Sequence, residues 1–158
     1  MEFSIRDATR ADEPFLIEML YQALFVPPGE PPLPPEIVDR PDLARYARGF
    51  GHQKGDQGWI AESPAAGLLG AAWVRQLPAE DPGYGFVDAD TPELSIAVVP
   101  DRRSRGLGTA LLGRLLGAVP RCSLSVDDRN AALRLYERCG FEVVSTDGHS
   151  LKMLRPSC

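Results

Sequence analysis

The segment from Arg102 to Gly108 concentrates residues that could hold an anion. Its order is Arg-Arg-Ser-Arg-Gly-Leu-Gly, so that three arginines and two glycines lie within one short stretch. A guanidinium group donates hydrogen bonds in a planar fork that suits phosphate oxygens. A glycine has no Cβ, so a bulky anion can approach the backbone. The segment is therefore a candidate phosphate-binding loop.

The elements expected on either side of this loop strengthen that interpretation. Residues 93–99 alternate between two faces, which predicts a β-strand that ends at Pro100. From Leu107 onward, leucines recur at helical spacing and predict an amphipathic helix. The first amides of a helix lack internal partners, and the helix dipole favours negative charge there. A pyrophosphate is the expected guest; the alternative is an ordinary turn with solvated arginines.

Two other phosphate-binding loops fit this segment less well. A Walker A loop requires a lysine after its last glycine, but here Gly108 is followed directly by Thr109. A dinucleotide fingerprint requires a third glycine where this chain has Leu111, although Asp127 lies about 20 residues further on, as that fingerprint asks. A dinucleotide site therefore stays open as an alternative.

A second pattern runs from Asn130 to Phe141. Residues 131–139 predict a helix that carries Tyr136 among apolar side chains, and Gly140 lies where a capping glycine belongs. Taken alone, this pattern is also typical of any helix with a core tyrosine and a glycine cap.

Together the two patterns resemble the signatures of the GNAT superfamily of N-acetyltransferases. The first resembles that family's Arg/Gln-x-x-Gly-x-Gly/Ala loop, and the second its Asn-x-x-Ala-x-x-x-Tyr-x-x-x-Gly-Phe helix. The resemblance implies that acetyl-CoA binds with its pyrophosphate in the loop and its pantetheine arm along the strand before it. The implied cofactor-binding residues are Ile96, Ala97, Val98, Arg103, Ser104, Arg105, Gly106, Leu107, Gly108, Thr109 and Asn130.

The second signature departs from the family in one spacing. The family's asparagine lies seven residues before the tyrosine, where this chain has Arg129, and Asn130 lies six before Tyr136. Either the helix starts one residue late and Asn130 still contacts CoA, or Asn130 only caps the helix.

The resemblance implies direct transfer of an acetyl group from acetyl-CoA to a primary amine, with no metal. An aliphatic amine has a pKa of about 10 and attacks only when neutral, so a base must take its proton. Glu93, at the start of the central strand, is the candidate base; the alternative is an exposed acid at a strand end. Tyr136 is the candidate acid for the departing thiolate. The acidic residues of loop 78–91 would attract a cationic amine.

The remaining elements predict an α/β fold with a mixed, mostly antiparallel central sheet flanked by helices, as in GNAT proteins. We expect strands at 2–8, 57–63, 68–77, 121–126, 141–145 and 150–154, and helices at 11–24 and 41–50. A proline-rich connector covers 25–35. The chain, 1–158, is expected to form one domain, with a cleft where the central strand and the next one splay. The connector and loop 78–91 should roof this cleft.

The amino-acid composition limits the kinds of partner that the protein could bind. The chain has 158 residues, of which 44% are hydrophobic and 25% charged, as in ordinary soluble proteins. A net charge of −5 argues against nucleic acid as a partner. With no long apolar run, we expect a cytoplasmic protein that does not bind membranes. The three cysteines lack metal-ligand spacing.

The sequence leaves three points open. The acceptor amine could be a small molecule or part of a peptide. A homodimer is compatible with the sequence. A non-catalytic acyl-CoA sensor on the same fold would keep the phosphate loop, although the presence of both Tyr136 and Glu93 favours the enzyme.

Overall fold

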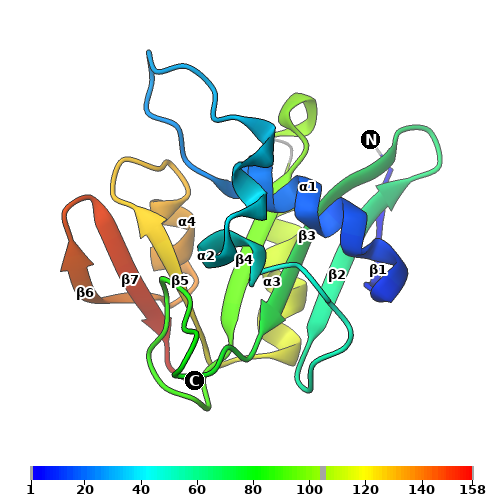
Figure 1. The fold of residues 1–158 in the computed structure, drawn as a ribbon. Coiled ribbons are helices and arrows are strands. Elements are labelled where there is room, and N and C mark those ends of the chain that lie inside the picture. The colour runs from blue at the N-terminus through cyan, green and yellow to red at the C-terminus, as the bar shows by residue number, and fades with distance from the viewer. Residues whose placement is uncertain (1, 104–105, 158) are drawn as a thin grey trace.

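The computed structural model describes residues 2–103 and 106–157, and these form a seven-stranded sheet with helices on both faces (Figure 1). The strand order is β1-β2-β3-β4-β5-β7-β6. Only β4 and β5 run parallel among the described neighbours. The predicted mixed, mostly antiparallel sheet is confirmed. The strands are Ser4–Asp7 (β1), Gln57–Ser63 (β2), Gly67–Arg75 (β3), Glu93–Val98 (β4), Cys122–Asp127 (β5), Glu142–Asp147 (β6) and Ser150–Arg155 (β7).

The helices divide between the two faces of the sheet. In the described chain they are α1 (Glu13–Ala23), α2 (Pro41–Ala44), α3 (Leu107–Ala118) and α4 (Leu133–Arg138), with 3-10 helices at Arg10–Asp12, Pro35–Asp39 and Pro100–Arg102. Helix α1 crosses one face and α3 lies behind the other (Figure 1). Leu16 of α1 packs in one core cluster with Trp73, while Leu111 of α3 packs in a second with Leu94. No described helix has the length and apolar character needed to cross a membrane.

Strands β4 and β5 part almost as soon as they meet. They are paired at Glu93 and Ser123, next to a 3.0 Å hydrogen bond from the Ser123 amide to the Pro92 carbonyl. No further pair joins β4 and β5 among the described residues, whereas the other edge of β5 pairs with β7 from Cys122 to Asp127. The C-terminal half of β4 therefore has a free edge, at the place where the sequence predicted a cleft.

Two predicted helices are shorter in the structure. The helix expected over 41–50 ends at Ala44 and continues as turns to Phe50. Gly49 and Gly51 adopt left-handed φ of +76° and +93°, which no α-helix can include, so the chain leaves the helical path before residue 50. The helix expected from residue 131 begins at Leu133, because the Asn130 side chain accepts the Ala132 amide at 2.9 Å and holds a turn there.

A buried ion pair fixes the turns after α2. Arg75 at the end of β3 bonds to Asp56 at 3.0 Å, and their side chains are 2% and 1% exposed. The same guanidinium donates to three carbonyls between residues 45 and 49. The Trp73 indole also donates to the Tyr46 carbonyl at 2.7 Å. These bonds hold the backbone around Tyr46 against the sheet.

We therefore expect Arg75→Met to lower the free energy of unfolding by about 3 kcal/mol or more, because it leaves Asp56 as a buried, unpaired charge. Urea denaturation monitored by circular dichroism measures this loss. Arg48→Met is the matched control, since Arg48 pairs with Asp39 on the exposed surface, and such pairs contribute about 1 kcal/mol or less. Equal losses in the two variants would contradict this role of Arg75.

Candidate functional site

Two adjoining cavities occupy the gap beside β4. The first, the splay cavity, has a volume of about 260 Å³ and lies between β4 and β5, with Tyr46 and Tyr84 on its wall. The second, the loop cavity, has about 630 Å³ and extends along β4 to the start of α3. The residues that border both are Ala23, Leu24, Phe25, Ile96, Asn130 and Tyr136. The two spaces therefore meet at the middle of β4.

The start of α3 has the features of an anion site. Gly106 is its N-cap in the left-handed conformation, with φ of +81°, and accepts the first helical bond from Ala110 at 3.0 Å. The amides of Leu107, Gly108 and Thr109 thus precede the internal hydrogen bonding of the helix. A Cβ built on Gly106 or Gly108 would meet no atom within 4 Å.

The side chains of this loop have different surroundings. Leu107 is 1% exposed and belongs to the core, so its backbone alone could face a ligand. Arg103 borders the loop cavity and donates to the Val98 carbonyl and to Gln22, each at 3.3 Å. It therefore ties the end of β4 to the end of α1. Ser104 and Arg105, also predicted as phosphate ligands, lie outside the described residues.

The free edge of β4 presents two amides toward the cavities. The Val99 amide donates to the Leu69 carbonyl of the β3 side at 2.8 Å. Amides alternate between the two edges of a strand, so those of Ile96 and Val98 point the other way, whereas that of Ala97 points to β3. The bond from Arg103 to the Val98 carbonyl comes from the same free edge.

Tyr136 of α4 lies where the two cavities meet. Its side chain is 9% exposed and packs edge-on against Phe141, with ring centroids 5.9 Å apart. Tyr136 borders both cavities, and none of the side-chain hydrogen bonds between described residues involves its hydroxyl. Burial raises the pKa of this phenol to about 12, so it keeps its proton at neutral pH.

Asn130 borders both cavities and also caps the turn before α4. Its Oδ1 accepts the Ala132 amide at 2.9 Å. The amide nitrogen of its side chain is a separate donor, so capping leaves one group for a ligand. The two interpretations of Asn130 are therefore compatible in this geometry.

The Glu93 side chain is 2% exposed, because the turns after α2 and loop 78–91 cover it. Its carboxylate accepts the amides of Gly83 at 2.9 Å and Gly85 at 3.0 Å, and the Tyr46 hydroxyl at 3.3 Å. Burial raises the pKa of Glu93, and these hydrogen bonds oppose the rise. Glu93 does not border either cavity, whereas Tyr46 borders the splay cavity.

Tyr46 is a site residue that the sequence did not indicate. It lies in the turns after α2, in a region predicted as helix, and no motif marks it. Its hydroxyl also accepts the Tyr84 amide, so it links Glu93 to the tip of loop 78–91. Only the folding of β3, β4 and this loop onto one another brings these groups together.

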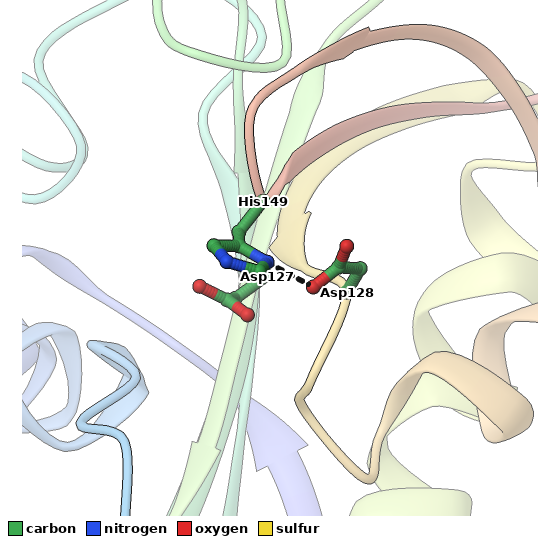
Figure 2. A group of neighbouring side chains, drawn as sticks. All are labelled: Asp127, Asp128 and His149. Carbon is green, nitrogen blue, oxygen red and sulfur yellow. Dashed lines mark hydrogen bonds and ion pairs between the residues drawn. The ribbon is translucent and has the colours of Figure 1, made fainter.

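One further group of polar side chains lies near the splay cavity. Asp127, Asp128 and His149 come together at the ends of β5 and β7, the only place in the described chain where three potential metal ligands gather (Figure 2). His149 Nδ1 lies 2.8 Å from Asp128 Oδ1, and Asp127 is bonded twice to Arg129. Each carboxylate therefore already has a partner within the protein.

Comparison with known proteins agrees with this geometry. The family model described as the acetyltransferase (GNAT) domain matches residues 54–143. No curated protein is significantly similar to the chain in sequence.

Many solved structures share the fold. The PaiA N-acetyltransferase of Thermoplasma acidophilum, solved with coenzyme A, is 19% identical with a TM-score of 0.65, over 98% of this chain and 99% of that one. The ribosomal-protein-S18-alanine N-acetyltransferase of Escherichia coli is 21% identical with a TM-score of 0.64, over 99% and 94%. The spermidine/spermine N-acetyltransferase SpeG of Vibrio cholerae is 18% identical with a TM-score of 0.60, over 97% and 91%.

The structural neighbours show the fold, and the family model covers more than half of the chain. The chain therefore belongs to the GNAT acetyltransferase family, a family of acetyl-CoA-dependent N-acetyltransferases.

Proposed function

We propose that the protein transfers the acetyl group of acetyl-CoA directly to a primary amine bound in the splay cavity. The observation that carries this proposal is the meeting of two cavities at Ile96 and Tyr136. Direct transfer needs a thioester and an amine to reach one point from two sides. The structural neighbours support it, since one was solved with coenzyme A and two are named for amine acceptors.

The loop cavity is proposed to take the CoA part of the co-substrate. The amides of Leu107, Gly108 and Thr109 would hold the pyrophosphate, in the open space beside Gly106 and Gly108. Ser104 and Arg105 belong to the same proposal on sequence grounds. Acetyl-CoA supplies the activated acetyl group; the protein supplies position and charge stabilisation.

The free edge of β4 is proposed to position the thioester. The amides of Ile96 and Val98 can bond to an extended pantetheine arm as a neighbouring strand would. An amide at this edge can also donate to the thioester oxygen as it gains negative charge during the reaction. Arg103, bonded to the Val98 carbonyl, holds this edge in place.

Tyr136 is proposed as the acid that protonates the departing thiolate. It borders both cavities and keeps its proton at neutral pH, and none of the side-chain hydrogen bonds between described residues involves its hydroxyl. A positioned general acid contributes roughly 10²–10⁴-fold to a rate.

Glu93 is proposed as the base, acting through Tyr46. The acceptor ammonium gives a proton to the Tyr46 oxygen, while the Tyr46 hydroxyl proton passes to Glu93 Oε1, 3.3 Å away. The tyrosine ends neutral and the amine is free to attack. Since burial raises the pKa of Glu93, its carboxylate is a better proton acceptor than an exposed glutamate.

Gly108→Val should weaken CoA binding at least tenfold, because its side chain would fill the space proposed for the pyrophosphate. Isothermal titration calorimetry with CoA measures the affinity. Gly113→Val is the matched control: it lies on the same helix, and a Cβ there also meets no atom within 4 Å, but it does not border the loop cavity. Unchanged CoA affinity in Gly108→Val would reject this loop as the pyrophosphate site.

Tyr136→Phe should lower kcat roughly 10²-fold or more while the affinity for acetyl-CoA stays near that of the wild type. A phenol donates only while protonated, and the pKa of Tyr136 is about 12. The wild-type rate should therefore not fall near pH 10, where an ordinary tyrosine loses its proton. Release of CoA thiol, followed across pH under single-turnover conditions, tests both statements. Full activity of the variant would remove Tyr136 from the chemistry.

Glu93→Gln and Tyr46→Phe should both lower the rate at moderate pH, by about tenfold or more, because each interrupts the proton path. A base works only when deprotonated, so the contribution of Glu93 appears as pH rises through its raised pKa. At high pH more acceptor is already neutral, and both defects should shrink. Tyr84→Phe is the control: its hydroxyl bonds to Asp42 rather than Glu93, and the wild-type pH dependence should persist. A pH-independent defect in Tyr46→Phe would contradict the relay.

A further inference from the structure

We propose that the acceptor is a small monoamine on an aromatic or branched apolar body, rather than a polyamine. This rests on the proposed function, since it takes the splay cavity as the acceptor site. The proposal stands on the chemical character of the cavity wall and on the pairing of the acids around it.

The wall of the splay cavity combines aromatic and aliphatic side chains with polar groups, most of them neutral. Four separate segments each contribute one ring: Phe25, Tyr46, Tyr84 and Tyr136. Leucines from α1, α2, β4 and β5 fill the surface between them, and the polar remainder consists of serines, Asn130 and one acid. Such a wall favours a ligand with an apolar body and few charges.

That acid, Asp127, is the only ionised side chain among the described residues of the wall. Its two oxygens are bonded to Nε and Nη2 of Arg129, at 2.9 and 2.8 Å. The Arg129 hydrogen bonds lower the pKa of Asp127 to about 2. The carboxylate already has its counter-charge, and Arg129 in turn lies 5.5 Å from the centre of the Phe25 ring.

Three other acids nearby are also paired, with groups outside the cavity. Asp128 is paired with His149, as the dashed line in Figure 2 shows. In loop 78–91, Asp81 pairs with Arg45 and Asp88 with Arg121. Tyr84 is the residue of that loop that borders the splay cavity. Among the described residues, loop 78–91 therefore places no carboxylate at the cavity wall. The geometry does not support the expectation that its acidic residues attract a cationic amine there.

This arrangement penalises a second ammonium group. An amine that loses its charge on reacting needs no permanent counter-ion, and apolar surroundings favour its neutral form. Each further ammonium of a polyamine would be desolvated without a free carboxylate, which is unfavourable. A volume of about 260 Å³, just below the usual range for drug-sized ligands of about 300–1,000 Å³, suits a body of one ring or a short branched chain.

The test is a comparison of kcat/KM for five amines with acetyl-CoA, followed by thiol release. The amines are 2-phenylethylamine, 3-methylbutylamine, 1,4-diaminobutane, spermidine and a short peptide with an N-terminal alanine. We expect the first two to exceed the others by at least tenfold. Equal or better use of spermidine, 1,4-diaminobutane or the peptide overturns the proposal.

Binding separates this proposal from the proposed function. Thermal shift is measured with CoA alone and then with CoA and each amine. A Tm raised by CoA and further by 2-phenylethylamine, but not by spermidine, supports the acceptor class even if turnover is slow. No shift with CoA rejects the proposed function, whereas a shift with CoA and with spermidine, but not with the apolar amines, rejects the acceptor class alone.

Arg129→Gln tests the charge pairing directly. It frees the Asp127 carboxylate at the cavity wall, so we expect the ratio of kcat/KM for 1,4-diaminobutane over 2-phenylethylamine to rise about tenfold. Arg121→Gln is the matched control, because Arg121 pairs with Asp88 outside the cavity, and the ratio should stay at its wild-type value. A ratio unchanged by Arg129→Gln contradicts the pairing as the reason for the preference.

Discussion

The meeting of β4 and β5 at Glu93 and Ser123 is the constraint on which the site depends. β5 stays paired with β7 on its other edge from Cys122 to Asp127, and it moves away from β4 together with β7. The backbone groups on this edge of β4 beyond that point are left without a strand partner, and buried backbone groups of this kind need one. An extended ligand arm along this edge would satisfy them. The gap in the sheet and the proposed binding groove are thus one feature.

Successive side chains of β4 point to opposite faces of the sheet, so this strand contributes to both core clusters. Leu94 and Val98 face α3 and join its core cluster, while Ala97 joins the α1 cluster on the other face. Glu93 shares the α1 face and is covered by loop 78–91. The edge of the same strand carries the amides of Ile96 and Val98. One strand therefore supplies side chains to the core, a buried acid, and backbone amides that are proposed to face a ligand.

Burial raises the pKa of both candidate catalytic side chains, Tyr136 and Glu93. It raises the pKa of Tyr136 and keeps that phenol protonated, as an acid requires. It also raises the pKa of Glu93, which increases its affinity for a proton. We propose that the splay cavity likewise favours a neutral amine. Loss of hydration would thus adjust the proposed acid, the proposed base and the proposed nucleophile.

The sequence by itself determined the order of the elements and the loop before α3. Period-two alternation, helical leucine spacing and the glycines at 106 and 108 are local signals, and the structure has the corresponding strand, helix and left-handed cap. It did not reveal the cover over Glu93, the role of Tyr46 or the pairing of Asp127 with Arg129. Those depend on contacts across the fold, such as the 47 residues between Tyr46 and Glu93. Local spacing cannot encode them, because only the packing of β3, β4 and loop 78–91 brings these groups within hydrogen-bond distance.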